Sequence, residues 1–398
     1  MRTKWKIYIA IWLVVALLNV VAWNSKAFCD WYIFHVFPLW VNTYGRLTGL
    51  VPFSVGEIMI VAGVILVVAA LLVGLTGVIF KAIGLAVAKS MKRPMKECEF
   101  AIAYGLFWEK ARALIAAFYR GVAWIVVVVA LVMTLNCFIL YHASTFSEKY
   151  FGEDKGEYTY EDLVTLRNFV VEKCNSLSEQ IPRKADGTIV YPGDMTKVAK
   201  QTMQKLGETY DGLGGYYPSP KPLAGSDFLS QQYMCGYYFP FSMEANYNSA
   251  MYVMNKPSTF CHELAHLKGY IYEDEANFIS YLACVQSEDI YFEYSGYLSV
   301  LYYLDNDFFA AAGKDRDRYL AEPVILSQVH EDAIFLTQEE WDRIEDKALL
   351  DTEVVDAASD AFTDTTLKLN GVSDGMISYS RVVKLLLQYY SFQGYNAR

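Results

Sequence analysis

Residues 261–278 read CHELAHLKGYIYEDEANF, and this stretch decides how the rest of the chain is interpreted. It contains the pattern H-E-x-x-H, in which His262 and His266 lie four positions apart. Side chains four positions apart on a helix project from one face, so both imidazoles can reach one metal ion. The chain has only five histidines, which makes a chance occurrence of this pattern rare. The stretch therefore predicts a metal site.

Zinc is the metal that this pattern favours, because zinc accepts neutral imidazole nitrogens and prefers four ligands. Glu263 directly follows the first histidine, which would place it beside the open coordination position. There it can take a proton from a water molecule held by the metal. The pattern thus predicts Zn²⁺ as the cofactor and Glu263 as the general base.

A third protein ligand is expected on a second helix, from about Glu273 to Val285, which follows a helix stop at Gly269. Its acidic first turn suits the positive end of the helix dipole. Glu273 and Asn277 share a face of this helix. We assign Glu273 as the third ligand and Asn277 as the residue that holds a ligand histidine by its other ring nitrogen. Glu275 is the alternative ligand, although it points to a different side of the helix.

H-E-x-x-H followed by a glutamate in an E-x-x-A-N setting resembles the gluzincin group of zinc metallopeptidases. The resemblance implies that Glu273 is the ligand and that Asn277, which stands where that group usually carries aspartate, supports a ligand histidine. The gap from His266 to Glu273 is shorter than in the best-known gluzincins. As a whole, the chain resembles an uncharacterised bacterial family of membrane-anchored HExxH proteins, which implies a zincin-like domain on a membrane anchor.

The distribution of charge divides the chain into two parts. Residues 1–141 carry 13 basic and 5 acidic side chains, whereas the remainder carries 21 basic and 39 acidic ones. The chain is 54% hydrophobic, with a mean hydropathy of +0.18. This pattern predicts a basic membrane part and an acidic soluble part. The acidic part argues against nucleic acid as a partner, because phosphate binding needs a basic face.

Three apolar runs predict transmembrane helices, at residues 7–23, 58–80 and 121–141. A signal peptide is the alternative for the first run, but its end has no small-residue cleavage pattern. Residues 24–56 hold several aromatic side chains and suit an interfacial or short external loop. The lipid bilayer is therefore an expected partner of residues 1–141, and residues 142–398 form the expected soluble domain.

The loop between the second and third runs is rich in lysine and arginine, and part of it suits an amphipathic helix on the membrane surface. By the positive-inside rule, this loop and the N-terminus lie in the cytoplasm. Three crossings then place residues 142–398 outside the cytoplasmic membrane. The chain is thus expected to be a multi-pass protein of the bacterial cytoplasmic membrane.

Outside the metal motifs the sequence gives weaker signals. A helix capped by Thr159 is expected at Tyr158–Leu177, and a long Gly- and Pro-rich loop at residues 207–225. Further helices are expected at residues 337–350 and 376–391, with turns at Asn370-Gly371 and Asp374-Gly375 between them.

Residues Tyr237–Tyr247 are the best strand candidate, and Pro240 favours an edge position for it. The resemblance to gluzincins implies an edge strand above the metal that pairs with the substrate backbone. Residues 243–246 could have that role or belong to an ordinary sheet edge. A tyrosine or histidine near the metal commonly stabilises the oxyanion in this chemistry. The candidates are Tyr294, Tyr297, Tyr302 and His330.

None of the seven cysteines forms a C-x-x-C pair, so no structural zinc site is predicted. Cys261 and Cys284 lie on the two proposed ligand helices, either as free buried thiols, which we favour, or as a disulfide.

The sequence therefore predicts three transmembrane helices followed by a mainly α, α+β zincin-like domain that hydrolyses peptide or protein substrates. A membrane sensor whose zinc domain binds a ligand without hydrolysis is the alternative. An intramembrane protease is disfavoured, because the charged metal motif lies far from the three apolar runs.

Overall fold

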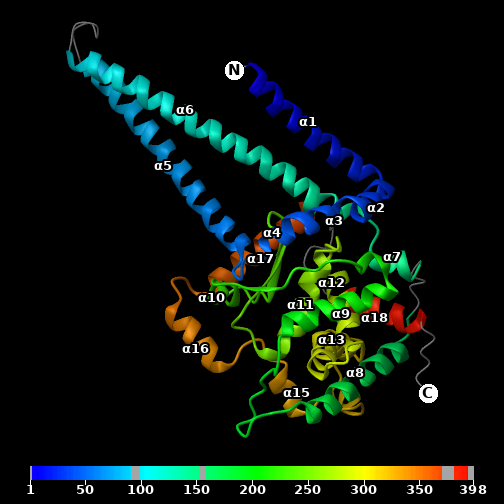
Figure 1. Ribbon diagram of the computed structural model, residues 1–398. Helices are drawn as coiled ribbons and strands as arrows, with labels where there is room; N and C mark the ends of the chain where they lie inside the picture. Colours follow the sequence, from blue (N-terminus) through cyan, green and yellow to red (C-terminus); the bar gives the residue numbers. More distant parts are fainter. Residues whose placement is uncertain (1, 91–98, 153–157, 370–380, 393–398) are drawn as a thin grey trace. The chain divides into compact units, whose positions relative to one another are not determined.

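The computed structural model describes residues 2–90, 99–152, 158–369 and 381–392 (Figure 1). The chain divides into two compact units. One comprises Met1–Asn19 and Gly56–Thr134, and the other comprises Val20–Val55 and Leu135–Arg398. Residues 20–55 and 135–141 thus belong with the larger unit, whereas the sequence suggested one boundary at residue 141.

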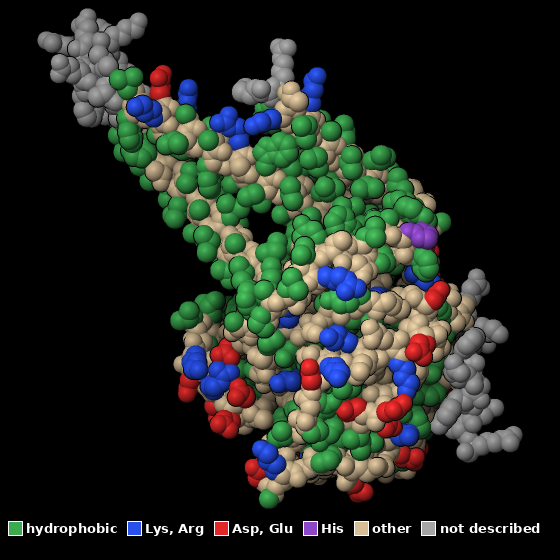
Figure 2. All heavy atoms as spheres, viewed as in Figure 1, with side chains coloured by type: hydrophobic (Ala, Val, Ile, Leu, Met, Phe, Trp, Pro, Cys, Tyr) green, Lys and Arg blue, Asp and Glu red, His purple; other side chains and the backbone are tan. Residues whose placement is uncertain are grey.

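Three long apolar helices, α1 (Arg2–Asn24), α5 (Val55–Ser90) and α6 (Glu99–Met133), run through the smaller unit. The candidate membrane spans are Thr3–Asn24, Val55–Ala86 and Leu106–His142, with mean hydropathies of 2.1, 3.1 and 2.6. Hydrophobic side chains cover most of the visible surface in the region of α5 and α6, and the charged side chains seen there gather toward its upper part (Figure 2). The three candidate spans contain all three predicted runs, although the third run continues past the end of α6 at Met133. Length and composition therefore support membrane association. α5 and α6 also extend into the expected basic loop.

The larger unit is mostly helical. Its longer helices are α8 (Tyr160–Gln180), α9 (Met195–Thr209), α11 (Lys256–His266), α12 (Glu273–Val285), α13 (Ile290–Ala311), α16 (Gln338–Lys347), α17 (Thr352–Leu369) and α18 (Arg381–Phe392). Helices α8, α11, α12 and α13 pack together, and their fully buried side chains, among them Leu264, Phe278 and Leu301, form the centre of the core. Shorter helices are α7 (Phe146–Tyr150), α10 (Ser226–Ser230), α14 (Arg316–Leu320) and α15 (Ser327–Asp332).

Several helices agree with the sequence signals that predicted them. Thr159 caps α8, and its side chain accepts a hydrogen bond from the backbone N–H of Asp162. α12 has the bounds predicted for the second ligand helix. α16 and α18 correspond to the two expected C-terminal helices, whereas α17 was not expected. The predicted turns at Asn370-Gly371 and Asp374-Gly375 lie outside the described residues.

The small sheet contains β1 (Lys221–Pro222), β2 (Gly236–Phe239) and β3 (Glu244–Tyr247) in the order β1-β3-β2. β3 pairs parallel to β1 and antiparallel to β2. The expectation of one strand from Tyr237 to Tyr247 is therefore wrong, because the chain turns back at Pro240 and forms a hairpin. Met243 lies in the turn of this hairpin and residues 244–246 belong to the central strand β3. Within the described sheet, the edge strand beside the ligand helices is therefore β2.

Residues 26–48 are helical, although the sequence suggested a loop. They form α2 (Lys26–His35), α3 (Phe37–Trp40), the π-helical turn η1 (Val41–Gly45) and α4 (Arg46–Thr48). Ser25 caps α2 through the backbone N–H of Phe28. Cys29, Tyr32 and Phe37 are buried in the core of the larger unit. Aromatic side chains on both sides of the segment hid its helical period.

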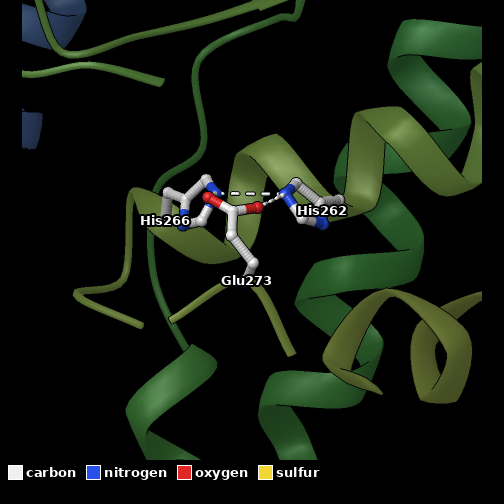
Figure 3. A group of neighbouring side chains, drawn as sticks. All are labelled: His262, His266 and Glu273. Atoms are coloured by element: carbon white, nitrogen blue, oxygen red, sulfur yellow. Dashed lines mark hydrogen bonds and ion pairs between the residues drawn. The ribbon is translucent and has the colours of Figure 1, made fainter. Parts of the chain in front are cut away.

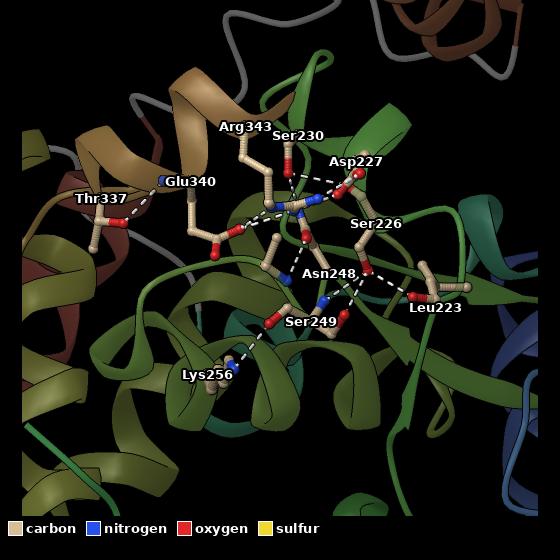
Figure 4. Close-up of polar contacts among 11 residues, drawn as sticks. Leu223, Ser226, Asp227, Ser230, Asn248, Ser249, Lys256, Thr337, Glu340 and Arg343 are labelled. Carbon is tan, nitrogen blue, oxygen red and sulfur yellow. Dashed lines mark hydrogen bonds and ion pairs between the residues drawn. The ribbon is translucent and has the colours of Figure 1, made fainter. Parts of the chain in front are cut away.

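An ion-pair cluster attaches α16 to α10 (Figure 4). The Arg343 guanidinium donates to both carboxylate oxygens of Asp227, at 2.8 and 2.6 Å, and to Glu340 at 2.9 Å. Bidentate geometry of this kind fixes orientation as well as distance. The cluster thus holds the C-terminal part of the unit against the loops that lead into the sheet.

Candidate metal centre

Helix α11 positions the two histidines of the motif. Phe260 and Leu264 are buried on the core side of this helix, which turns His262 and His266 toward the first turn of α12. After α11 the chain reverses at Gly269, whose φ of +90° favours glycine. A Cβ at this position would lie 2.9 Å from a side-chain carbon of Ile33 in α2, so the turn between the two helices is tightly packed.

The side chains of His262, His266 and Glu273 meet at one point (Figure 3). The two Nε2 atoms lie 3.1 Å apart. Glu273 places one carboxylate oxygen 3.0 Å from His262 Nε2 and the other 3.7 Å from His266 Nε2. Their ligand atoms all lie within 4.8 Å of one another. The structure therefore brings together the three residues that were predicted as ligands.

Hydrogen bonds at the other ring nitrogens fix which nitrogen of each imidazole faces this point. His266 Nδ1 lies 2.8 Å from the carbonyl oxygen of Tyr270, which can only accept, so Nδ1 carries the proton and the Nε2 of the neutral ring is bare. His262 Nδ1 lies 2.8 Å from Asn277 Oδ1, which imposes the same arrangement. Two bare nitrogens and a carboxylate that face one another repel unless a cation lies between them. The donor set therefore fits a metal ion such as Zn²⁺.

The pKa values of the three cluster residues also indicate that the cluster is stable only with a positive charge in it. Burial lowers the pKa of His266 to about 4. Burial also lowers the pKa of His262, but the Glu273 carboxylate outweighs the effect of burial and raises this pKa to about 9. Burial raises the pKa of the Glu273 carboxyl, but the two histidines outweigh this effect and lower that pKa to about 2. Without a metal, a proton on His262 supplies the missing cation.

Glu263 is buried directly beside the cluster. It is 3% exposed, and its Oε2 has no hydrogen-bond partner among the described residues. Burial raises the pKa of this carboxyl to about 8. Gly236, the first residue of β2, lies against it, and a Cβ there would be 2.8 Å from Glu263 Oε1. The open strand edge therefore begins at the predicted general base.

Glu275, the alternative ligand, lies away from the cluster. Its carboxylate accepts hydrogen bonds from the backbone N–H of Ser147 at 3.3 Å and from the Ser147 hydroxyl at 2.9 Å. Burial raises its pKa to about 7. The geometry therefore favours Glu273 over Glu275 as a ligand.

The residues suggested for oxyanion stabilisation are engaged elsewhere. The Tyr294 hydroxyl donates to Asp332 at 2.8 Å, and Tyr302 bonds His330 at 2.7 Å. Tyr297 packs edge-on against Phe169 and Tyr281. None of these contacts reaches the cluster.

Two tyrosines near the cluster were not predicted. Tyr303 of α13 is close enough to Cys235 and Glu273 for their charges to add to the effect of burial in raising its pKa. The ring of Tyr238 in β2 lies 6.2 Å from that of His266. Neither position carries a local sequence pattern, because each reaches the site only through the packing of α13 and β2 against α11 and α12.

Cys261 and Cys284 are both buried free thiols, and their sulfur atoms lie 3.8 Å apart. This arrangement agrees with the favoured alternative from the sequence. The two thiols meet where α11 packs against α12.

The fold and the site together define a mostly helical protein that has three candidate membrane spans and a cluster of two histidines and a glutamate. The family model described as "Protein of unknown function (DUF3810)" matches residues 32–387. The match covers most of the chain, so the chain belongs to this family. No curated protein and no solved structure matches it.

Proposed function

We propose that the chain is a membrane-anchored zinc peptidase of the gluzincin type, which hydrolyses peptide bonds outside the cytoplasmic membrane. One observation carries the proposal. The Nε2 atoms of His262 and His266 converge with the Glu273 carboxylate beside Glu263, a buried carboxyl with one oxygen that has no hydrogen-bond partner among the described residues. A core side chain or a surface ion pair would not leave these groups incomplete.

Under this proposal each residue has a separate role. His262, His266 and Glu273 would hold Zn²⁺, which when bound supplies a Lewis acid for the scissile carbonyl. Asn277 and the Tyr270 carbonyl orient the two imidazoles. Glu263 takes a proton from the attacking water and delivers it to the leaving amine. The C–N bond breaks, the carbonyl carbon gains OH, and the nitrogen gains H.

The raised pKa of Glu263 suits both halves of this proton transfer. A carboxyl whose pKa lies near the working pH can accept a proton and give it up again. Burial raises the pKa of Glu263 to about 8, whereas the positive charge of His262 lowers it. A metal ion held by the cluster would also favour the carboxylate form.

The surroundings of the cluster could bind and polarise a peptide. A substrate backbone can pair with the open edge of β2, which begins beside Glu263. Tyr303, which is half-buried near Glu273 and Cys235, is our candidate for donating a hydrogen bond to the oxyanion.

The test is the substitution Glu263→Gln in the full chain. Glutamine keeps the shape of the side chain but cannot accept the proton, so cleavage should slow by at least about a hundredfold while zinc is retained. The measurement is mass spectrometry of a peptide library incubated with each protein, beside metal analysis. Glu275→Gln is the control, because it changes another buried glutamate and should leave cleavage intact. Equal cleavage by the wild type and Glu263→Gln would refute the catalytic role.

A further inference from the structure

The segment between the first two candidate spans is bound to the larger unit along one face. Ile33 packs against the turn at Gly269. The Thr48 hydroxyl donates to the Ser242 carbonyl at 2.9 Å, and the ammonium of Lys221 in β1 donates to the Thr48 carbonyl at 2.7 Å. Residues 26–53 therefore pack against the turn between the two ligand helices and against the sheet.

The opposite face of this segment is apolar and exposed. Seven of its side chains are each at least 50% exposed, namely Trp31, Phe34, Leu39, Tyr44, Leu47, Leu50 and Phe53. We call these residues the outer face of α2–α4. Only Lys26, Asp30 and Arg46 carry formal charge between residues 26 and 53. An exposed apolar face of this size, rich in aromatic residues, is typical of a contact surface.

Chain connectivity identifies what covers the outer face. The segment follows the span Thr3–Asn24 and leads directly into the span Val55–Ala86. Both of its ends therefore lie at the same surface of one bilayer, whichever way the spans are inserted. Tryptophan and tyrosine are enriched at the headgroup level, and helices with one apolar face lie in the interface. The occupant with matching chemistry is the lipid surface.

One side chain, that of Tyr238, connects the metal centre to the end of the third candidate span. The ring of Tyr238 is 6.2 Å from that of His266, and its hydroxyl donates to the Asn136 carbonyl at 3.1 Å. Asn136 belongs to the span Leu106–His142. Tyr272 precedes the proposed ligand Glu273 in the chain, and its hydroxyl donates to the Tyr141 carbonyl.

The open strand edge leads from the metal centre to this span. β2 begins at Gly236, beside Glu263, and ends at Phe239. The next residue, Pro240, accepts a hydrogen bond from Asn136 Nδ2 at 2.9 Å. At about 3.3 Å per residue, the four residues of the strand cover only about 13 Å. A peptide paired along β2 would run between the metal centre and the end of the span.

We propose that the metal centre takes extended segments that emerge from the same bilayer, and that the outer face of α2–α4 lies among the lipid headgroups to hold it there. The substrate class is the juxtamembrane part of membrane-anchored polypeptides, cut within a few residues of the lipid surface. This inference rests on the proposed peptidase function. Peptides free in solution would reach the same edge without the anchor that raises their local concentration.

The first experiment uses the zinc-loaded full chain in lipid vesicles. The probes are random peptides joined to a transmembrane anchor by about four residues or by a flexible linker of about thirty residues, and the same peptides without an anchor. Mass spectrometry should show cleavage of the short-spaced probes at least about tenfold faster than of the others. Equal rates for all three would overturn this inference and leave the peptidase function intact. Cleavage of none of them would overturn the peptidase function itself.

A second experiment tests the lipid contact without using activity. A photoreactive phenylalanine analogue replaces Leu50 or, as the control, Leu320, an exposed leucine on the polar helix α14. Irradiation should crosslink lipid to the analogue at position 50 and not at position 320, because only the first lies at the interface. Equal crosslinking at the two positions would contradict the placement.

Substitutions on the outer face of α2–α4 test whether its contact with lipid affects the cleavage of anchored probes. Leu47→Glu combined with Leu50→Glu places charge among the lipid contacts and should slow cleavage of short-spaced anchored probes by about tenfold. Cleavage of the free peptides and the zinc content should not change. Leu320→Glu should change neither. An unchanged rate on the anchored probes in the double variant would count against the role of the outer face.

Discussion

At the scale of single residues, Glu273 and Glu275 show how two similar positions acquire different surroundings. Glu273 faces the two histidines, whereas Glu275 accepts two hydrogen bonds from Ser147. We predict that Glu273→Gln lowers zinc content far below one ion per chain and that Glu275→Gln leaves it unchanged, because only the first removes a charged ligand. Metal analysis of the purified full chain after dialysis measures this. The reverse order would move the ligand assignment to Glu275.

The His262 proton leads to a prediction about pH. Glu273 raises the pKa of His262 to about 9 in the metal-free chain, so this imidazole is protonated at pH 7. Zinc needs the neutral ring and must displace that proton. Binding should therefore release at least about one proton at pH 7, with a further share from Glu263, whose carboxylate form the metal favours, and affinity should rise at least about tenfold per pH unit up to about pH 8. Calorimetry in buffers of different ionisation enthalpy counts the protons. Release of none would show that His262 is neutral before zinc binds.

The sequence predicted the residues whose relation is local. His262 and His266 share one helix, and Glu273 and Asn277 share another, so helical spacing alone placed each pair on one face. The contacts between the pairs depend on the turn at Gly269, which the sequence also indicated. Tyr303 and Tyr238 reach the site from elements distant in the chain, and no period or motif could have identified them.

At the scale of elements, the turn between α11 and α12 sets the distance between the ligands. Gly269 has a φ of +90° and would place a Cβ against Ile33, whereas Gly187 has a φ of +85° and open space around it. Gly187→Ala should therefore lower the free energy of unfolding by only about 1 kcal/mol, the cost of placing an alanine in a left-handed backbone conformation. Gly269→Ala should lower the free energy of unfolding by at least about 1 kcal/mol more than Gly187→Ala does, because the Ile33 side chain must move as well. Thermal unfolding of the full chain in detergent compares the two, and equal losses would show that the Ile33 contact contributes nothing.

The elements that the sequence missed share a physical cause. The stretch from Tyr237 to Tyr247 is apolar enough for one strand, but Pro240 and the positive φ of Met243 turn it into a hairpin. The helices between residues 26 and 48 carry aromatic side chains on both faces, so no single apolar stripe revealed their period. Burial of one face in the larger unit, which depends on distant residues, decides their conformation.

At the scale of the whole molecule, the distribution of charge predicts the orientation in the membrane. The basic side chains of residues 1–141 should hold the N-terminus and the loop between α5 and α6 in the cytoplasm. Protease added to spheroplasts should therefore digest the acidic residues 142–398 without lysis. An antibody tag at the N-terminus provides the control and should stay protected until lysis. Protection of the acidic part in intact spheroplasts would reverse the orientation.

The larger unit is assembled from two stretches of chain, because α6 and all but the first residue of α5 come between residues 20–55 and residues 135–398. Ribosomes therefore finish Cys29, Tyr32 and Phe37 long before they make the core residues that bury these side chains. The early stretch must therefore wait, between two candidate membrane spans, until the later stretch is made and folds onto it. The second and third candidate spans are thus an insertion within a discontinuous unit, and a truncated chain that starts at residue 142 lacks part of the core of that unit.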